Sequence, residues 1–262
     1  MGKPETETPI PAVWGRKRAD LADAQANVSW AFSQLSPLAR RLDDWLDRSV
    51  IVELRDPGPA ATHNLIIGVE KEALPLFANV EVGMCLNAIR SSLDILAMTL
   101  VRRHGLNVRE EQVYFPIARS ETVFKDKNWS GRKFLDVLPE KDRTIIESLM
   151  PYKGGSESLW ALHHLDIVRK HRRLLSVELH PISVSLQGTL QEGDFKPLAV
   201  EAVHVNEETI IGMLRKGVDA KLVQSKFYVR LDEEGDIARC PVVGALAHLT
   251  DVAAGIIWQF DY

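Results

Sequence analysis

The side chains best suited to chemistry lie on two segments with helical periodicity. The first segment carries Asn87, Arg90 and Asp94, which fall within roughly 60° of one another at about 100° per residue. This narrow polar line borders an apolar face that extends from Leu86 to Leu100. An amide, a guanidinium and a carboxylate at this spacing could bind an anion or orient a histidine.

The second segment, residues 157–175, carries three histidines beside an apolar helix side. His163 lies on that side, and His164 and His171 lie close to it. The arginines of this segment are expected to point towards water: Arg169, Arg172 and Arg173. If the apolar faces of the two helices pack together, the polar line of the first helix meets the histidines of the second.

Two interpretations of this seam involve no catalysis. A buried Arg–Asp–His set must be mutually satisfied, since an unpaired charge away from water costs several kcal/mol, so the network could simply fix the helix register. The protein would then work through a partner or as a homo-oligomer. Alternatively, the seam is a binding site for an anionic small molecule, a nucleotide or RNA, with these contacts: Asn87, Arg90, His163, Asp166, Lys170 and Arg172.

A third interpretation is enzymatic. In a metal-independent phosphodiester cleavage, His171 or His164 would act as general acid and base. Asp94 would orient the histidine, and Arg90 would stabilise the developing charge.

Metal and nucleotide cofactors are not predicted. His164 and His171 are about 10 Å apart along a helix axis at 1.5 Å per residue, which is too far to share one ion. His163 and Asp166 are three residues apart and could share one, but such a pair is common by chance. The sequence contains no HExxH, GxGxxG, GxxxxGK[ST] or GxSxG motif.

Composition indicates an ordinary globular chain. It has 262 residues, 45% of them hydrophobic and 26% charged, and a net charge of −4 that gives no global basic field for nucleic acid. Two cysteines are too few for a disulfide framework. The N-terminus lacks the apolar core of a signal peptide, and no uncharged apolar run approaches the ~18 residues of a membrane span. We therefore expect a cytoplasmic protein without membrane contact.

The order of elements predicts an α+β fold with a helical core. Residues 1–16 are expected to form a mobile segment and residues 17–262 a single domain. Ser36-Pro37 predicts either a new helix or a kink. Long helices are predicted at about 18–47, 79–104, 157–175 and 241–260. β-Branched runs predict an N-terminal hairpin and a C-terminal antiparallel sheet, with strands at 50–54, 64–69, 176–186, 198–205, 209–214 and 225–231.

Four short strings resemble a family of bacterial and phage proteins. They are NxxRSxLDxLA at 87–97, FPI at 115–117, PY at 151–152 and LHxLDxxxKHRxL at 162–174, and the resemblance covers roughly residues 50–180. It implies no particular activity.

More distantly, two helices with polar groups at their interface are similar to HEPN domains, which implies a helical bundle and a metal-independent ribonuclease. The ribonuclease motif of that superfamily is Arg followed by His after four to six residues. It is absent from the two helices that carry the resemblance.

Overall fold

A computed structural model describes residues 18–171, 174, 175, 177–200, 202, 203, 207–231, 233, 237 and 240–262. It confirms the α+β prediction. The helices are α1 (Ala22–Ser49), α2 (Leu76–Arg103), α3 (Glu121–Lys125), α4 (Ser130–Val137), α5 (Glu140–Ser148), α6 (Glu157–His171) and α7 (Val242–Trp258). The strands are β1 (Val50–Arg55), β2 (His63–Glu70), β3 (Val177–Gly188), β4 (Phe195–Pro197), β5 (Glu208–Arg215) and β6 (Ala220–Leu231).

The chain groups into two compact units. One is helical and comprises Met1–Leu35, Gly83–Arg173 and Leu246–Tyr262; the other contains the strands and comprises Ser36–Val82 and Leu174–Ala245. Three of the four boundaries fall inside the helices α1, α2 and α7, and the fourth, between residues 173 and 174, follows the end of α6. One domain over residues 17–262 therefore stays a prediction, and the expected mobile segment 1–16 lies outside the described residues.

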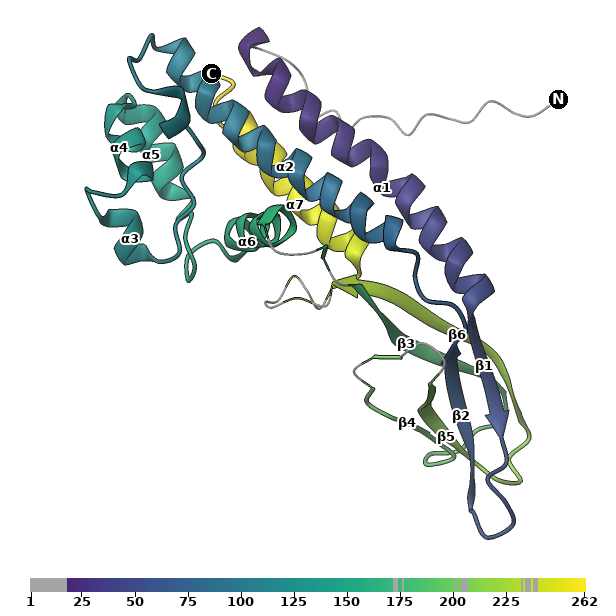
Figure 1. Cartoon of the computed structure of the whole chain (residues 1–262). Coiled ribbons are helices and arrows are strands. Elements are labelled where there is room, and N and C mark those ends of the chain that lie inside the picture. Colours follow the sequence, from purple (N-terminus) through teal and green to yellow (C-terminus); the bar gives the residue numbers. More distant parts are fainter. Residues whose placement is uncertain are drawn as a thin grey trace, which may run out of the picture. The chain divides into compact units, whose positions relative to one another are not determined.

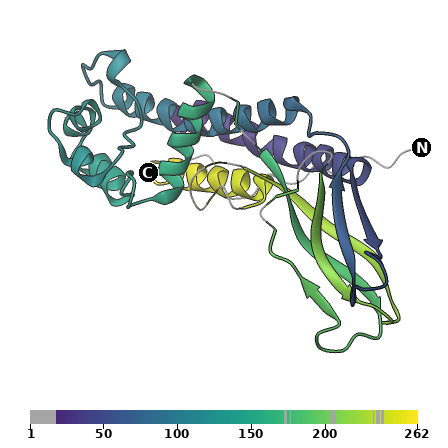
Figure 2. The ribbon, with the colours of Figure 1, turned by 60° about the horizontal axis from the view of Figure 1, so that its bottom comes forward.

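In the helical unit, α2 runs alongside α1 and α7, while α3, α4 and α5 gather near its C-terminal end (Figure 1). The α6 helix crosses the direction of α2, as Figure 2 shows in green. Side chains at steps of three and four form the core on each long helix because these positions share one helix face. Fully or nearly buried examples are Ala24, Val28, Leu86, Ile89, Leu93, Leu162, Leu165, Leu249 and Ile256.

Helix α1 continues through Pro37, so the single long helix predicted at about 18–47 is confirmed, and the alternative of a new helix at Ser36 is wrong. A proline inside a helix removes one backbone hydrogen bond. The buried stripe nevertheless continues on both sides of it, through Leu35, Leu38 and Leu42, and this burial favours one continuous helix.

Other helix boundaries shift by a few residues. Helix α2 begins at Leu76, three residues before the prediction, and ends where Gly105 adopts a φ of 59°. There the Leu106 N–H donates to the carbonyl of Val101, as in a Schellman motif, so the predicted glycine cap is confirmed. Helix α6 ends at His171, and Leu174 and Leu175 are not helical.

The strands form two antiparallel sheets. The predicted hairpin β1–β2 is confirmed, and β2 also pairs with β5 to give the order β1-β2-β5-β4. Strands β3 and β6 form a separate pair. A strand is predicted at 198–205, but its described residues 198–200, 202 and 203 form none. Strand β4 at Phe195–Pro197 pairs with the edge of β5 instead, and Val203 makes an isolated bridge to Leu179.

Within the described ranges, α2 is the one helix long and apolar enough to cross a membrane. In its most apolar window 61% of the residues are buried, and the core helix of a soluble protein passes the same test.

Candidate functional site

The predicted polar line of α2 holds a loop in place. Arg90 and Asp94 are one turn apart, and Arg90 Nη1 donates to Asp94 Oδ1 over 2.6 Å. Arg90 Nη2 donates to the carbonyl of Phe115 (3.0 Å), while the Phe115 N–H donates to Asp94 Oδ1 (2.9 Å). The Arg90 side chain is only 5% exposed. Both polar groups of the Phe115 backbone are therefore clamped by one ion pair.

The clamped segment continues into a second backbone contact. The Ala118 N–H donates to the carbonyl of Pro151 (2.8 Å), and the Lys153 N–H donates to the carbonyl of Ala118 (3.3 Å). This places the FPI string beside the PY string, more than thirty residues later in the chain. The Arg90–Asp94 pair thus sets the position of a loop wall, residues 115–119.

Asn87 binds an arginine of α6, not a histidine. Arg169 Nη2 donates to Asn87 Oδ1 (2.8 Å) and to Asp166 Oδ1 (3.3 Å). The expectation that Arg169 points towards water is therefore wrong. Lys170 Nζ lies 2.6 Å from Asp166 Oδ2, so the nearly buried Asp166 carboxylate is paired with two cations of its own helix.

The three histidines of α6 have different surroundings. The His164 ring stacks on Trp160 with centroids 5.7 Å apart, His163 is half-buried, and His171 is exposed. Over the described part of the chain, none of them hydrogen-bonds to Asn87, Arg90 or Asp94. The predicted Asp–His pairing at the seam is wrong because Asp94 is occupied by Arg90 and Phe115.

His163 nevertheless belongs to a pocket. A shallow cavity of about 440 Å³, which we call the His163 pocket, is lined by Ile117, Ala118, Arg119, Val123, Asp126, Asn128, Trp129 and His163. The clamped loop, the end of α3 and α6 each supply part of this lining. The line on α2 that was predicted to contact a ligand thus supports one wall of the pocket.

The exposed rim of the pocket is polar. Arg119 and Asn128 are exposed, and Arg119 makes no ion pair with any described residue. The carboxylate of Asp126 accepts from the N–H of Asn128 (2.9 Å), so it is engaged within its own turn. A guanidinium without a protein partner is available to bind a negatively charged group.

Trp129 is held by close packing. Its ring lies 6.0 Å from that of Phe124, which also packs against Tyr152 at 5.4 Å. A Cβ added to Gly131 would come within 2.4 Å of a Trp129 ring carbon, so only glycine leaves room for the indole in this place. The pocket therefore has a half-buried aromatic ring in a fixed position.

The imidazole of His163 is uncharged at neutral pH. Burial lowers its pKa to about 4, the positive charge of Arg90 adds to this effect, and the carboxylate of Asp166 opposes it. A neutral imidazole has one donor and one acceptor nitrogen, and it can therefore bind an uncharged polar edge of a ligand.

No metal centre is formed by the residues that the structure describes, since no three His, Cys, Asp or Glu side chains lie close enough to share an ion. Arg172, predicted as a ligand contact, lies outside the described residues.

One Arg–His pair does have the HEPN spacing of six intervening residues, Arg173 and His180. His180 lies on strand β3, however, where it pairs with Tyr228, and Arg173 is outside the described residues. The spacing therefore does not recreate the two-helix arrangement of that superfamily.

Of the residues that line the pocket, only His163 was predicted as a site residue. The polar and aromatic residues Arg119, Asn128 and Trp129 are among those that were missed. They lie between short elements, where no periodicity indicates a shared face; the only local signal is the extended FPI piece that precedes Arg119. Comparisons with protein-family models, curated proteins and solved structures find no match to this chain.

Proposed function

We propose that the protein binds a nucleotide, free or within single-stranded RNA, in the His163 pocket. The observation that carries the proposal is the combination of three groups around one cavity, from Arg119, Trp129 and His163. They are a guanidinium without an ion pair among the described residues, a fixed indole and a half-buried polar ring. Its volume of about 440 Å³ falls within the usual range for small-molecule sites.

Each group suits a different part of a nucleotide. Stacking of a base on an aromatic ring such as Trp129 contributes about 1–3 kcal/mol. The Arg119 guanidinium can bind phosphate oxygens through two parallel hydrogen bonds. Neutral His163 and the amide of Asn128 can donate to and accept from the base edge, which is how single-stranded bases are read.

Binding is better supported than cleavage. A general acid or base works best with a pKa near the working pH, whereas that of His163 is about 4. His164 is stacked on Trp160, and Asp94 is held by Arg90. The net charge of −4 also favours a short, local contact over a long electrostatic track.

The register hypothesis fits the same geometry. The Arg90–Asp94 pair is satisfied within the protein by Phe115, so it acts as a positioning pair for the loop wall rather than as a ligand contact. Whether the protein forms homo-oligomers stays a prediction.

The test is calorimetric titration with AMP, adenosine and a short single-stranded RNA. We expect Arg119→Gln to weaken AMP binding about tenfold and to leave adenosine unchanged, because only AMP carries the phosphate. Trp129→Leu should weaken both ligands. Arg109→Gln, which changes another exposed arginine outside the pocket lining, is the matched control.

Two results would overturn the proposal. One is the absence of saturable binding of all three ligands at millimolar concentration. The other is metal-independent cleavage of the RNA that is lost in His171→Ala or His164→Ala, which would favour the ribonuclease interpretation instead.

A further inference from the structure

An exposed lysine, Lys127, borders the His163 pocket without lining it. It stands between the lining residues Asp126 and Asn128, in a turn that the Trp129 N–H closes by donating to the carbonyl of Asp126 (3.0 Å). The Asp126 carboxylate accepts from the Asn128 N–H, and Lys127 makes no ion pair with a described residue. The lysine therefore adds an unpaired positive charge beside the part of the lining that carries the indole.

A second exposed lysine, Lys153, borders the pocket at another segment. Its N–H donates to the carbonyl of the lining residue Ala118 (3.3 Å), and its Nζ lies 5.9 Å from the ring centroid of Trp160. The Trp160 ring lies 6.2 Å from that of His163, so the ammonium is near the part of the lining that α6 supplies. The Glu157 carboxylate accepts from a backbone N–H, and Lys153 makes no ion pair with a described residue.

The two lysines give the surroundings of the pocket a local positive charge in a chain whose net charge is −4. Together with Arg119 they present three cations without ion pairs in the described part of the chain, whereas the lining holds one carboxylate, that of Asp126. Lysine binds phosphate as a point charge. A nucleotide in the pocket engages Arg119, which leaves the lysines for phosphates that lie outside it.

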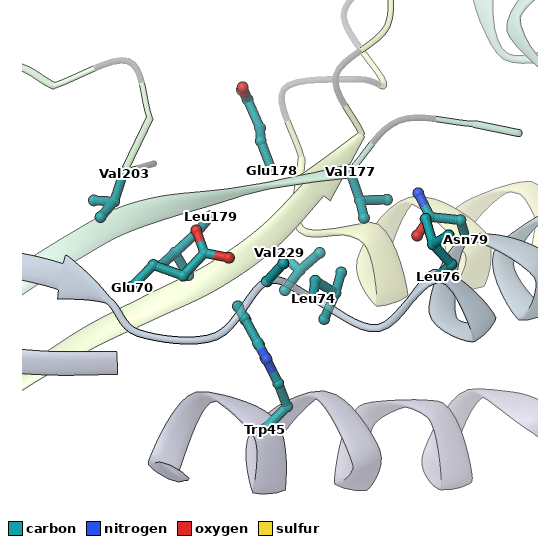
Figure 3. A pocket seen from close by; sticks show the side chains of 11 residues that line it. Trp45, Glu70, Leu74, Leu76, Asn79, Val177, Glu178, Leu179, Val203 and Val229 are labelled. Carbon is teal, nitrogen blue, oxygen red and sulfur yellow. The ribbon is translucent and has the colours of Figure 1, made fainter. Parts of the chain in front are cut away.

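The cavity of the strand-containing unit lacks this combination. It has a volume of about 280 Å³, and its lining is mainly aliphatic (Figure 3). None of the residues that line it is a lysine or an arginine. The exposed Lys71 follows the lining residue Glu70 in the chain, so it borders a cavity as Lys127 does, but one without a guanidinium to bind a phosphate. Lys71 therefore provides a matched control.

We infer that the ligand is a strand of single-stranded RNA rather than a free nucleotide, with one nucleotide in the His163 pocket and its flanking phosphates bound by Lys127 and Lys153. This inference rests on the proposed function, since it takes the pocket as a nucleotide site. Proteins that bind single strands combine base stacking on an aromatic ring with cations that follow the backbone. The lysines belong to two separate segments, so a strand can enter past one and leave past the other, whereas the phosphates of a free nucleotide all leave the base on one side.

The experiment measures the affinity of the full chain for hexa-adenylate, AMP and ATP by calorimetry from about 50 to about 200 mM NaCl. Three phosphate contacts predict that the logarithm of the hexa-adenylate affinity falls against the logarithm of the salt concentration with a slope of about −2, at about −0.7 per phosphate of a single strand. AMP, bound by Arg119 alone, should give a slope of about −0.7.

Two lysine variants test the flanking contacts. Lys127→Gln and Lys153→Gln should each weaken hexa-adenylate about threefold at low salt and make its slope shallower by about 0.7. Both should leave AMP and ATP within about twofold, because these ligands place no phosphates beside both lysines. Lys71→Gln should change the binding of none of the three ligands. A hexamer can bind in several registers, so the slope and the variants decide the test rather than its tighter binding.

The outcomes separate this inference from the proposed function. If AMP binding depends on Arg119 and Trp129 but the lysine variants leave hexa-adenylate and its slope unchanged, the strand inference is overturned and the nucleotide site stands. The inference is also overturned if the lysine variants weaken ATP as much as hexa-adenylate, since the lysines would then bind a polyphosphate. If neither AMP nor hexa-adenylate binds at millimolar concentration, the proposed function and this inference are both overturned.

Discussion

Arg169 of α6 lies directly across Gly83 of α2. A Cβ at residue 83 would be 2.6 Å from Cδ of Arg169, in the middle of its side chain. The same arginine reaches Asn87 one turn further along α2. Gly83 leaves room for the Arg169 side chain, and Asn87 accepts its hydrogen bond. Together these two residues of α2 allow α6 to pack closely against it.

Gly83→Ala should therefore destabilise the protein. Alanine is favoured over glycine in a helix by about 1 kcal/mol. The added methyl group, however, displaces Arg169 and weakens its hydrogen bonds to Asn87 and Asp166, which for charged donors contribute about 1.5–3 kcal/mol. We expect a net loss of about 1 kcal/mol in the free energy of unfolding, measured with urea.

Gly255→Ala in α7 is the matched control. A Cβ there meets nothing within 4 Å, so only the helix propensity changes. This variant should gain about 0.5–1 kcal/mol. Equal gains for both variants would show that Arg169 does not depend on the space above Gly83.

Removing Arg90 should cost more than altering Asp94. Arg90→Met leaves the Phe115 carbonyl without its donor and Asp94 without its counter-ion. Breaking a buried pair typically costs 3–5 kcal/mol, and since the Asp94 side chain is 36% exposed we expect about 2–4 kcal/mol.

Asp94→Asn keeps an oxygen that can accept from both Phe115 and Arg90, so it should cost only about 1 kcal/mol. Urea unfolding of both variants provides the comparison. The clamp would be contradicted if Arg90→Met were the milder of the two.

The stability of the helical unit should fall as the pH drops below 6.5. The pKa of His163 is lowered from 6.5 to about 4 in the folded protein, so between these values the unfolded chain takes up a proton that the folded chain does not. Linkage then lowers the free energy of unfolding by at most about 2 kcal/mol between pH 7 and pH 5. Asp20, with a pKa lowered to about 2, titrates below this window.

His163→Gln removes this titrating group while keeping a polar side chain. The difference in unfolding free energy between the variant and the unaltered protein should change over pH 5–7 by that same amount. A constant difference over this range would mean that His163 ionises equally well in the folded state.

The contact between the Asp142 carboxylate and Tyr262 can be tested by a titration at alkaline pH. Asp142 is fully buried; its Oδ2 lies 2.6 Å from Nε2 of His104, and its Oδ1 accepts from the Tyr262 hydroxyl. Burial and this hydrogen bond raise the pKa of Tyr262 to about 12. Asp142→Asn should bring one tyrosine back towards a pKa of about 10, measured by tyrosinate absorbance. Tyr262→Phe should remove that titration altogether, and a transition that persists would assign it to another tyrosine.

Hydrophobic periodicity predicted those elements whose own sequence contains a regular apolar face. Helix α2, the β1–β2 hairpin and α7 each present one regular apolar face, and each was located to within a few residues. The segment 198–205 contains three valines, but its described residues form no strand, and Phe195–Pro197 pairs with the edge of β5. Which segment pairs with β5 depends on the rest of the sheet, and neither segment encodes it alone.

The site was predicted in part for a similar reason. The helix positions correctly indicated that α2 and α6 approach each other at Asn87, but Arg169 lies off the apolar face of its own helix and was assigned to water. Its position depends on Gly83, a residue of the other helix. The pocket residues Arg119 and Trp129 come together only through loop packing, which no repeating pattern encodes.

The pairing of β2 with β5 has a consequence for synthesis on the ribosome. Residues 63–70 must wait for residues 208–215 before the sheet gains its third strand, so more than a hundred residues emerge while one edge of the hairpin is unpaired. Such distant pairing slows folding, and an open edge invites association with other chains. A nascent chain that stalls before β5 therefore exposes the unpaired edge of the hairpin and is prone to aggregate. Folding of this unit is completed only late in translation.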